Sequence, residues 1–173
     1  MITRLSISNL AIIEKAEVDF APGLNVLTGE TGSGKSVIMG AIGLALGARS
    51  DASSVRDGEE NSRIEAEFEV GEKRDLVNSV LSDAGLPNCE DGELIIRRVL
   101  SGSGAGKVWV NDSRTTLTTL KNLARVLVEG VSILGWVALW DVGEELLLHL
   151  ITNYNKRRNL KRIASAKVEF IYK

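Results

Sequence analysis

The first residues of the chain alternate between hydrophobic and polar side chains, which is the pattern of a strand with one buried face. Ile2 to Leu10 alternates in this way, and Ala16 to Phe20 repeats the pattern. Residues 23–28 form a short apolar run after a Pro22-Gly23 turn and predict a third, buried strand. We therefore expect a sheet to begin before the first helix.

The hydrophobic period changes to that of a helix near Lys35. The apolar residues that share one helical face are Val37, Ile38, Ala41, Ile42 and Ala45. Gly47 is placed to end this helix, and the polar stretch from Arg49 to Arg63 predicts a loop. Ile64 to Val70 then alternates again, with glutamates at every second position, and predicts an antiparallel strand with one face in solvent.

The second half of the chain continues to mix helices and strands. Arg74 to Ala84 predicts a helix that Gly85 stops, and residues 94–100 and 107–110 predict two strands. Asn111-Asp112 can make the tight turn that follows. A last helix is predicted by the apolar stripe Leu117, Leu120, Ala124 and Leu127. This mixture indicates an α/β fold.

One glycine-rich run carries candidate chemistry, because it fits the motif G-x-x-x-x-G-K-[ST] at every defined position. The run is Gly29-Glu30-Thr31-Gly32-Ser33-Gly34-Lys35-Ser36, between a predicted strand and a predicted helix. Glycines let backbone N–H groups turn inward around an anion, and the helix N-terminus adds the positive end of its dipole. Lys35 would reach the β- and γ-phosphates, and the Ser36 hydroxyl would bind Mg²⁺. The sequence therefore predicts a nucleoside triphosphate site.

A second glycine-rich run, from Ser101 to Val108, resembles this motif only superficially. It lacks the first glycine and the hydroxyl residue after Lys107, and a predicted strand follows it instead of a helix. This run therefore predicts a flexible hairpin connection and not a second phosphate site.

Composition narrows the class of protein without giving a function. The 173 residues are 44% hydrophobic and 25% charged, which is typical of one globular domain. Cys89 is the single cysteine, so no internal disulfide and no cysteine cluster for a metal can form. The start of the chain shows no signal-peptide pattern, and the longest uncharged apolar stretch, residues 131–140, is too short to cross a bilayer. We expect a soluble, intracellular protein with no transmembrane segment.

Charge is distributed unevenly along the chain. The formal net charge is −2, but residues 151–173 carry +6, so the first 150 residues carry −8. The main body is thus not a basic nucleic-acid-binding surface. The basic tail has three interpretations: a solvated tail, non-specific binding to a phosphate backbone, or attachment of an amphipathic helix at Leu146 to Ile151 to a membrane surface.

Residues on both sides of the phosphate-loop motif carry a resemblance to a known family. The matching stretches are Leu5-x-Ile7-x-Asn9-Leu10-Ala11-Ile12-Ile13-Glu14, Phe20-x-Pro22-Gly23 running into the motif, Ala45-Leu46-Gly47-Ala48-Arg49-Ser50 and Val55-Arg56-Asp57-Gly58. Over about residues 1–129 the chain closely resembles the N-terminus of the RecN family of bacterial DNA repair proteins.

This resemblance implies an SMC-like ATPase, whose ABC-type head is split between the two ends of a long chain joined by a coiled coil. It implies an α/β fold: an incomplete P-loop NTPase head lobe of ABC/SMC type with a mixed sheet. The implied ligands are ATP and Mg²⁺ at Gly29 to Ser36. Arg4, Arg49 and Arg56 lie on segments that in such heads come near nucleotide or the partner head, although an exposed solubilising role is equally open.

The resemblance also implies partners and a compartment. The implied target is DNA, in double-strand break repair and recombination, and the implied protein partner is a second head or a complementing C-terminal head lobe. The implied location is the cytoplasm, in association with the nucleoid, or an organelle of bacterial origin.

The chain departs from the family pattern beyond its first 129 residues. The segment after Leu127-Val128-Glu129 lacks the glutamine that belongs to the family's nucleotide site, and the whole chain contains no Gln. The ABC signature loop is absent, and the nearest candidate for the acidic strand end, Ile133 to Asp141, lacks the catalytic acid that should follow. We therefore divide the chain into an ATPase head lobe, residues 1–129, and a divergent tail, residues 130–173. Our hypothesis for this tail is a truncation, a frameshift or an unspliced intron.

Hydrolysis of ATP by this chain alone stays open, and so do two other functions. One is a different P-loop NTPase that is complete within the chain, for which Asp112 or Asp141 would have to bind Mg²⁺. The other is a non-hydrolysing interaction module that pairs with a full-length head and regulates it.

Overall fold

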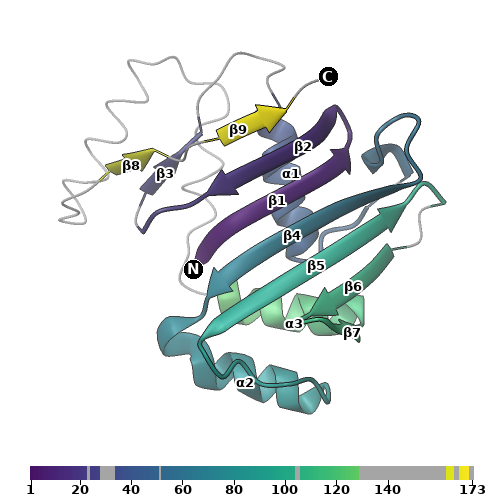
Figure 1. Ribbon diagram of the computed structural model, residues 1–173. Helices are drawn as coiled ribbons and strands as arrows, with labels where there is room; N and C mark the ends of the chain where they lie inside the picture. Colours follow the sequence, from purple (N-terminus) through teal and green to yellow (C-terminus); the bar gives the residue numbers. More distant parts are fainter. Residues whose placement is uncertain are drawn as a thin grey trace.

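The computed structural model describes residues 1–22, 24–27, 34–50, 52–103, 106–128, 163–165 and 168–171 (Figure 1). The strands are β1 (Ile2–Leu10), β2 (Ile13–Asp19), β3 (Leu24–Val26), β4 (Asn61–Glu69), β5 (Glu93–Ser101), β6 (Gly106–Val110), β7 (Ser113–Thr115), β8 (Ile163–Ser165) and β9 (Val168–Ile171). The helices are α1 (Lys35–Ala45), α2 (Arg74–Asp83) and α3 (Leu117–Val128), with short 3-10 helices at Ala52–Ser54 and Gly71–Lys73.

Seven strands form one antiparallel sheet in the order β7-β6-β5-β4-β1-β2-β9. In β1, Leu5 lies opposite Val18 of β2 on one side and Ala66 of β4 on the other. β3, which leads toward the phosphate-loop motif, pairs in parallel with β8. The predicted α/β fold is confirmed, with antiparallel pairing in the large sheet and parallel pairing in the small one.

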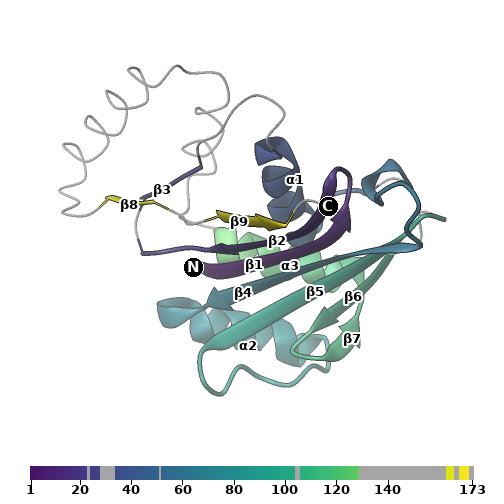
Figure 2. The same cartoon turned by 45° about the horizontal axis from the view of Figure 1, so that its top comes forward.

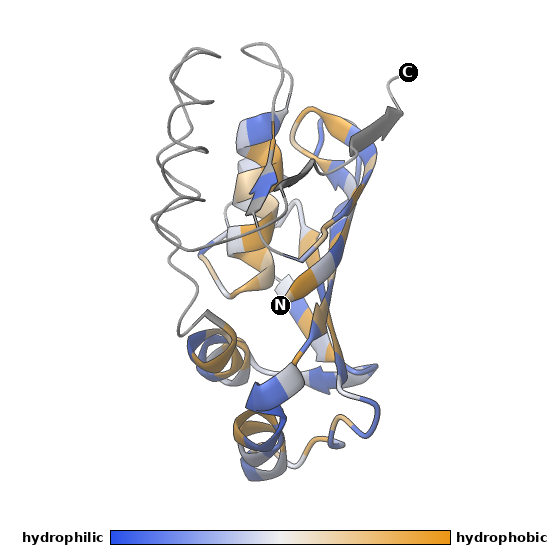
Figure 3. Ribbon diagram, turned by 90° about the vertical axis from the view of Figure 1, so that its left-hand side faces the viewer, coloured by the Kyte–Doolittle hydropathy of each residue, from blue (hydrophilic) through white to orange (hydrophobic). Residues whose placement is uncertain are grey.

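The helices cover one face of the large sheet. α1 contacts β1, β4 and β5, α3 contacts β6, and α2 packs against α3. Figure 2 shows α1 on one side of β1 and β2, and in Figure 3 the helices lie to one side of the sheet. The large side chains buried between these layers include Leu5, Ile7, Ile13, Ile38, Ile64, Leu81, Leu94, Ile96, Leu100, Leu120 and Leu123. Burial of each such side chain stabilises the fold by about 1.5–3 kcal/mol.

The structure differs from the sequence prediction at the start of β2 and in the connection that follows α1. β2 begins at Ile13, because the turn after Leu10 takes only two residues and the strands pair from there onward. Within the expected loop from Arg49 to Arg63, Ala52–Ser54 forms a 3-10 helix and residues 61–63 already belong to β4. The backbone N–H of Ala11 donates to Ser54 in this connection, which therefore packs against the β1–β2 turn.

The second glycine-rich run joins β5 to β6. Ser101 ends β5 and Gly106 begins β6, with Leu100 opposite Gly106 across the antiparallel pair. The predicted hairpin connection is therefore confirmed. No helix within the described ranges combines the length and the apolar character that a bilayer crossing requires.

Asn111 and Asp112 form the tight turn between β6 and β7, as the sequence predicts. Their φ angles are 45° and 61°, and a left-handed backbone at both central residues is typical of a type I′ hairpin turn. The Asn111 side-chain oxygen accepts the backbone N–H of Ile95 at 2.9 Å, which fixes the turn to β5. β7 itself was not predicted, because Ser113, Arg114 and Thr115 are all polar and give no alternation.

The N-terminus of α3 depends on one hydroxyl group. Thr116 precedes the helix, and its Oγ1 accepts a hydrogen bond from the backbone N–H of Thr119 at 3.1 Å. We expect Thr116→Ala to lower the free energy of unfolding by about 1 kcal/mol, measured by urea denaturation. Thr116→Ser should restore most of this loss, and Thr118→Ala, at an exposed neighbouring position, is the matched control. An equal loss in the control would contradict the capping role.

Candidate functional site

The predicted phosphate-loop motif runs into the N-terminus of α1. Residues 29–33 lie outside the described residues, so Gly34, Lys35 and Ser36 are the motif residues whose positions are described. Gly34 is buried and has φ 86° and ψ 2°, a left-handed backbone that glycine adopts freely and other residues adopt with strain. Its carbonyl oxygen accepts the N–H groups of Val37 and Ile38, both at 3.0 Å, and so begins the helix.

Lys35 and Ser36 are the first two residues of α1. Lys35 is half-buried and Ser36 is exposed, and the first turn of the helix has no acidic residue. A helix N-terminus presents unpaired N–H groups and a positive dipole end, so this lysine and this hydroxyl stand where an anion is favoured. Such an arrangement can bind phosphate groups, and a serine hydroxyl at this position is a suitable Mg²⁺ ligand. The role of the whole motif, Gly29 to Ser36, stays a prediction.

α1 is anchored along its length, which keeps its N-terminus in place. Ile38, Ala41, Leu44 and Ala45 are buried on the face that the sequence pattern predicted. This face contacts β1, β4 and β5 at the centre of the sheet. The N-terminal end of α1 therefore stands on a rigid support, as the predicted phosphate site requires.

A buried arginine holds the other end of α1. Arg98 on β5 is 4% exposed, and its Nη1 donates to the carbonyl oxygens of Leu44 at 2.8 Å and Ala48 at 2.6 Å. Its Nη2 donates to Ser50 Oγ at 3.2 Å. Burial lowers the pKa of the Arg98 guanidinium, since its hydrogen-bond partners are neutral. Arg98 thus adds a second donor to the Leu44 carbonyl, which also accepts the N–H of Gly47 at 3.0 Å, and it supplies a donor to the Ala48 carbonyl beyond the end of the helix.

Sequence reasoning missed Arg98, although the alternation of β5 contains the signal. Leu94, Ile96 and Leu100 are buried core residues, and Arg98 occupies the next position of the same face. A charged residue in phase with the apolar side of a strand has to find hydrogen-bond acceptors inside the protein. This position could have been singled out for that reason.

The three arginines that the resemblance placed near nucleotide lie in three different settings. Arg4 pairs with Asp19 at 2.7 Å, and this hydrogen bond raises the pKa of Arg4. Arg56 donates from Nη1 to the carbonyl oxygen of Ile12 at 2.8 Å, at the β1–β2 turn. Arg49 is exposed and lies beyond the C-terminal end of α1. This helix is about 16 Å long at about 1.5 Å per residue, so Arg49 is far from the N-terminus of α1. The structure does not bring these three side chains together.

Of the two acidic residues considered for Mg²⁺, the structure describes Asp112, which lies away from the N-terminus of α1. Asp112 pairs with Arg97 at 2.9 Å. Arg97 faces away from α1, since its neighbour Arg98 bonds to α1 and consecutive side chains of a strand point to opposite faces. Asp141 lies outside the described residues. Over the part of the chain that the structure describes, no group of three His, Cys, Asp or Glu side chains could hold a metal ion.

Comparison with known proteins assigns this chain to a family. The family model for an AAA domain matches residues 4–132. DNA repair protein RecN of Vibrio cholerae serotype O1 is 38% identical over 128 residues, which are 74% of this chain and 23% of that protein. DNA repair protein RecN of Bacillus subtilis (strain 168) is 40% identical over 129 residues, 75% of this chain and 22% of that protein. The chain therefore spans less than a quarter of the length of these curated relatives.

The fold has a counterpart among solved structures. A structure from work on ATP-driven dimerization and DNA stimulated activation of SMC ATPases matches with a TM-score of 0.60 at 21% identity. The match covers 88% of this chain and 98% of that chain, and at this identity it shows the fold alone. The chain belongs to the AAA domain family, and its matched region is a homologue of the N-terminal region of RecN with the fold of part of an SMC ATPase head.

Proposed function

We propose that this chain is an ATP-binding head lobe of a RecN-like SMC-family protein that acts in repair of DNA double-strand breaks and in recombination. The observation that carries the proposal is the position of Gly34, Lys35 and Ser36 at the start of a core-anchored helix, inside a region homologous to RecN. An AAA domain implies nucleotide binding, and the proposal specifies ATP with Mg²⁺. The compartment that follows from it is the cytoplasm, where the chromosome lies.

In this proposal the eight motif residues bind different parts of the triphosphate and its Mg²⁺. The backbone of Gly29 to Gly34 surrounds the phosphates, and the left-handed Gly34 turns the chain into α1. Lys35 neutralises charge on the β- and γ-phosphates, and Ser36 holds Mg²⁺, which supplies further positive charge to the same oxygens. Arg98 fixes the far end of α1 and so helps to keep Lys35 and Ser36 in place.

We infer that ATP binding by this chain proceeds with little turnover. Phosphoryl transfer needs a group that orients the attacking water and an acidic Mg²⁺ ligand. The sequence lacks the family's glutamine, signature loop and catalytic acid, and the first turn of α1 carries no acidic residue. The matched SMC ATPase comes from work on ATP-driven dimerization, which supports the idea that a second head or a C-terminal head lobe completes the site. DNA would then be the target of the assembled protein and not of this lobe alone.

A second candidate function is a non-hydrolysing module that pairs with a full-length head. The observation that favours it is that the segment after Glu129 lacks the glutamine that belongs to the family's nucleotide site, and the chain contains no Gln. Titration of the protein with ATP·Mg²⁺, followed by binding and by phosphate release, tests the first candidate: binding without release supports it, and steady turnover supports a self-contained NTPase. Lys35→Ala tests the second: pairing with a full-length head that is unchanged in this variant supports the interaction module.

Removal of the Ser36 hydroxyl should uncouple ATP binding from Mg²⁺. Mg²⁺ should raise the ATP affinity of the unchanged protein, and we expect this gain to be about tenfold smaller in Ser36→Ala. About tenfold is the lower end of the losses seen when a metal site is disturbed. The measurement is a fluorescent ATP titration in Mg²⁺ and in EDTA. Ser36→Thr keeps the hydroxyl and should retain the gain. An unchanged Mg²⁺ dependence in Ser36→Ala would remove Ser36 from the metal site.

A further inference from the structure

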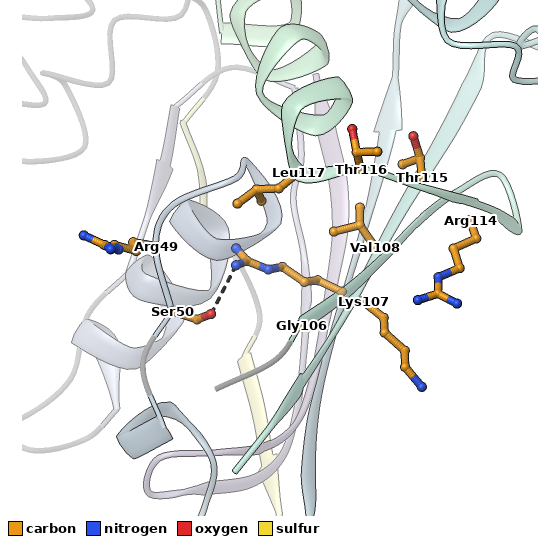
Figure 4. A pocket seen from close by; sticks show the side chains of 10 residues that line it. Arg49, Ser50, Gly106, Lys107, Val108, Arg114, Thr115, Thr116 and Leu117 are labelled. Atoms are coloured by element: carbon orange, nitrogen blue, oxygen red, sulfur yellow. Dashed lines mark hydrogen bonds between the residues drawn. The ribbon is translucent and has the colours of Figure 1, made fainter. Parts of the chain in front are cut away.

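A cavity of about 330 Å³ lies at the C-terminal end of α1, the end opposite the phosphate-loop motif. Its walls come from the segment after α1, from β5 and β6, and from the beginning of α3 (Figure 4). The lining residues that matter here are Arg49, Ser50, Arg98, Gly106, Thr116 and Leu117. Among the described residues that line this cavity, none is Asp or Glu, so its electrostatic potential is positive.

Arg98 brings a positive charge to this cavity without a negative partner. Its hydrogen bonds go to two carbonyl groups and to Ser50, the bond drawn as a dashed line in Figure 4. Its Nε is buried without a hydrogen-bond partner, and no carboxylate of the described residues forms an ion pair with it. A buried charge is costly unless an opposite charge balances it, and the helix carbonyls supply only partial charge.

Gly106 lies next to this unpartnered atom and contributes no side chain there. A Cβ built at Gly106 would lie 3.9 Å from Arg98 Nε and 3.5 Å from Leu100 Cδ2, both ordinary contact distances. Gly106 is the first residue of β6, and its φ is not in the left-handed region, so a branched side chain fits its backbone. A side chain at this position would therefore fill the space next to the guanidinium without disturbing the strand.

Two further features of the cavity favour an anion. α3 begins at Leu117, so the positive end of its dipole lies at the wall, beside the Thr116 hydroxyl. Arg49 is exposed, and Figure 4 shows its charged end turned away from Leu117 and Thr116, so it adds positive charge near the cavity without reaching its interior. Lys107 and Arg114 also line the cavity, and Figure 4 shows their charged ends turned away from Thr116 and Leu117, so they add to the field without contacting its interior.

We propose that this cavity binds a terminal phosphate group, which serves as the counter-ion of Arg98. A terminal phosphate carries up to two negative charges and several acceptor oxygens, which suit a guanidinium, a helix N-terminus and a hydroxyl together. A phosphodiester carries one charge, so it balances the cluster of positive groups less well than a terminal phosphate does. The group belongs to inorganic phosphate, to a small phosphate monoester or to the 5′ end of a nucleic-acid strand. The site is separate from the phosphate-loop motif, at the other end of α1.

Titration of inorganic phosphate into the Lys35→Ala protein tests this proposal, because that background weakens the other phosphate site. We expect phosphate binding that two variants each weaken about tenfold or more: Arg49→Glu, which reverses the charge beside the cavity, and Gly106→Val, which fills the space next to Arg98. Both variants keep Arg98 and its bonds to α1, so both should fold. Arg125→Glu, at an exposed position on α3, is the matched control and should not change the affinity.

Competition with two oligonucleotides of one sequence, with and without a 5′-phosphate, identifies the source of the group. Displacement by the phosphorylated strand alone assigns a strand end, and displacement by neither assigns a free phosphate or a small monoester. Equal displacement by both strands overturns the proposal, because it shows general attraction to the backbone. The proposal also fails if phosphate does not bind, if chloride at equal ionic strength has the same effect, or if Arg49→Glu and Gly106→Val bind as tightly as Arg125→Glu.

Discussion

Lys35→Ala is expected to weaken ATP·Mg²⁺ binding about 100-fold while leaving the fold intact. Hydrogen bonds to charged groups contribute about 1.5–3 kcal/mol each, and each 1.4 kcal/mol is a factor of ten in affinity. Lys35 is half-buried at the first position of α1, where its charge adds to the positive helix end. Calorimetric titration with ATP·Mg²⁺ measures the affinity, and circular dichroism checks the fold.

Lys15→Ala is the matched control for this substitution. Lys15 is exposed on β2 and pairs with Glu17 at 3.3 Å, a surface contact that contributes little to stability. Its loss should leave both ATP affinity and folding unchanged. If Lys35→Ala binds ATP as tightly as Lys15→Ala does, the phosphate-loop assignment is wrong and the nucleotide site lies elsewhere.

Arg98→Met is expected to lower the free energy of unfolding by about 2–4 kcal/mol. Methionine fills a similar volume but makes none of the hydrogen bonds that the guanidinium donates to the carbonyl groups of Leu44 and Ala48 and to Ser50, and a hydrogen bond to a charged group contributes about 1.5–3 kcal/mol. Removal of a buried charge offsets part of this loss. Urea denaturation measures this loss: the midpoint concentration of the unfolding transition should fall, and the dependence of the free energy on urea concentration should stay constant.

Arg125→Met on the exposed face of α3 is the comparison, and it should change stability by less than about 0.5 kcal/mol. Arg98→Lys keeps the charge but loses the forked donor geometry, so it should recover only part of the stability. A loss in Arg98→Met no larger than in Arg125→Met would mean that the bonds to the end of α1 contribute nothing to folding.

The elements with a clear hydrophobic period could be predicted from the sequence. α1 has its buried face where the spacing of Ile38, Ala41 and Ala45 placed it, and β4 alternates between buried Ile64 and the half-buried Glu65 that follows it. In such segments the order of apolar and polar residues alone determines which face of the helix or strand is buried. The motif at the start of α1 was visible for a related reason, since its glycine and lysine positions are set by local geometry.

The parts that escaped prediction depend on contacts between distant segments. β7 consists of polar residues and becomes a strand because the type I′ turn at Asn111-Asp112 returns it against β6. The 3-10 helix at Ala52–Ser54 forms where the chain packs on the β1–β2 turn, which no local pattern announces. The cavity at Arg98 requires β5, α1 and α3 to meet, so it has no counterpart in any single stretch of sequence.

The order of strands in the large sheet also sets the sequence of events in folding. β1 and β2 are joined by a two-residue turn, and β4 to β7 follow one another as neighbours, so both groups can form from local contacts. They are united by the pairing of β1 with β4, as at Ile7 and Ile64, which closes a loop that contains α1. Closing such a loop has an entropic cost and slows folding relative to local hairpins. During synthesis, the helix that begins at Lys35 cannot reach its final packing until β4 and β5 have emerged, so Lys35 and Ser36 take their final positions only after these strands have joined β1.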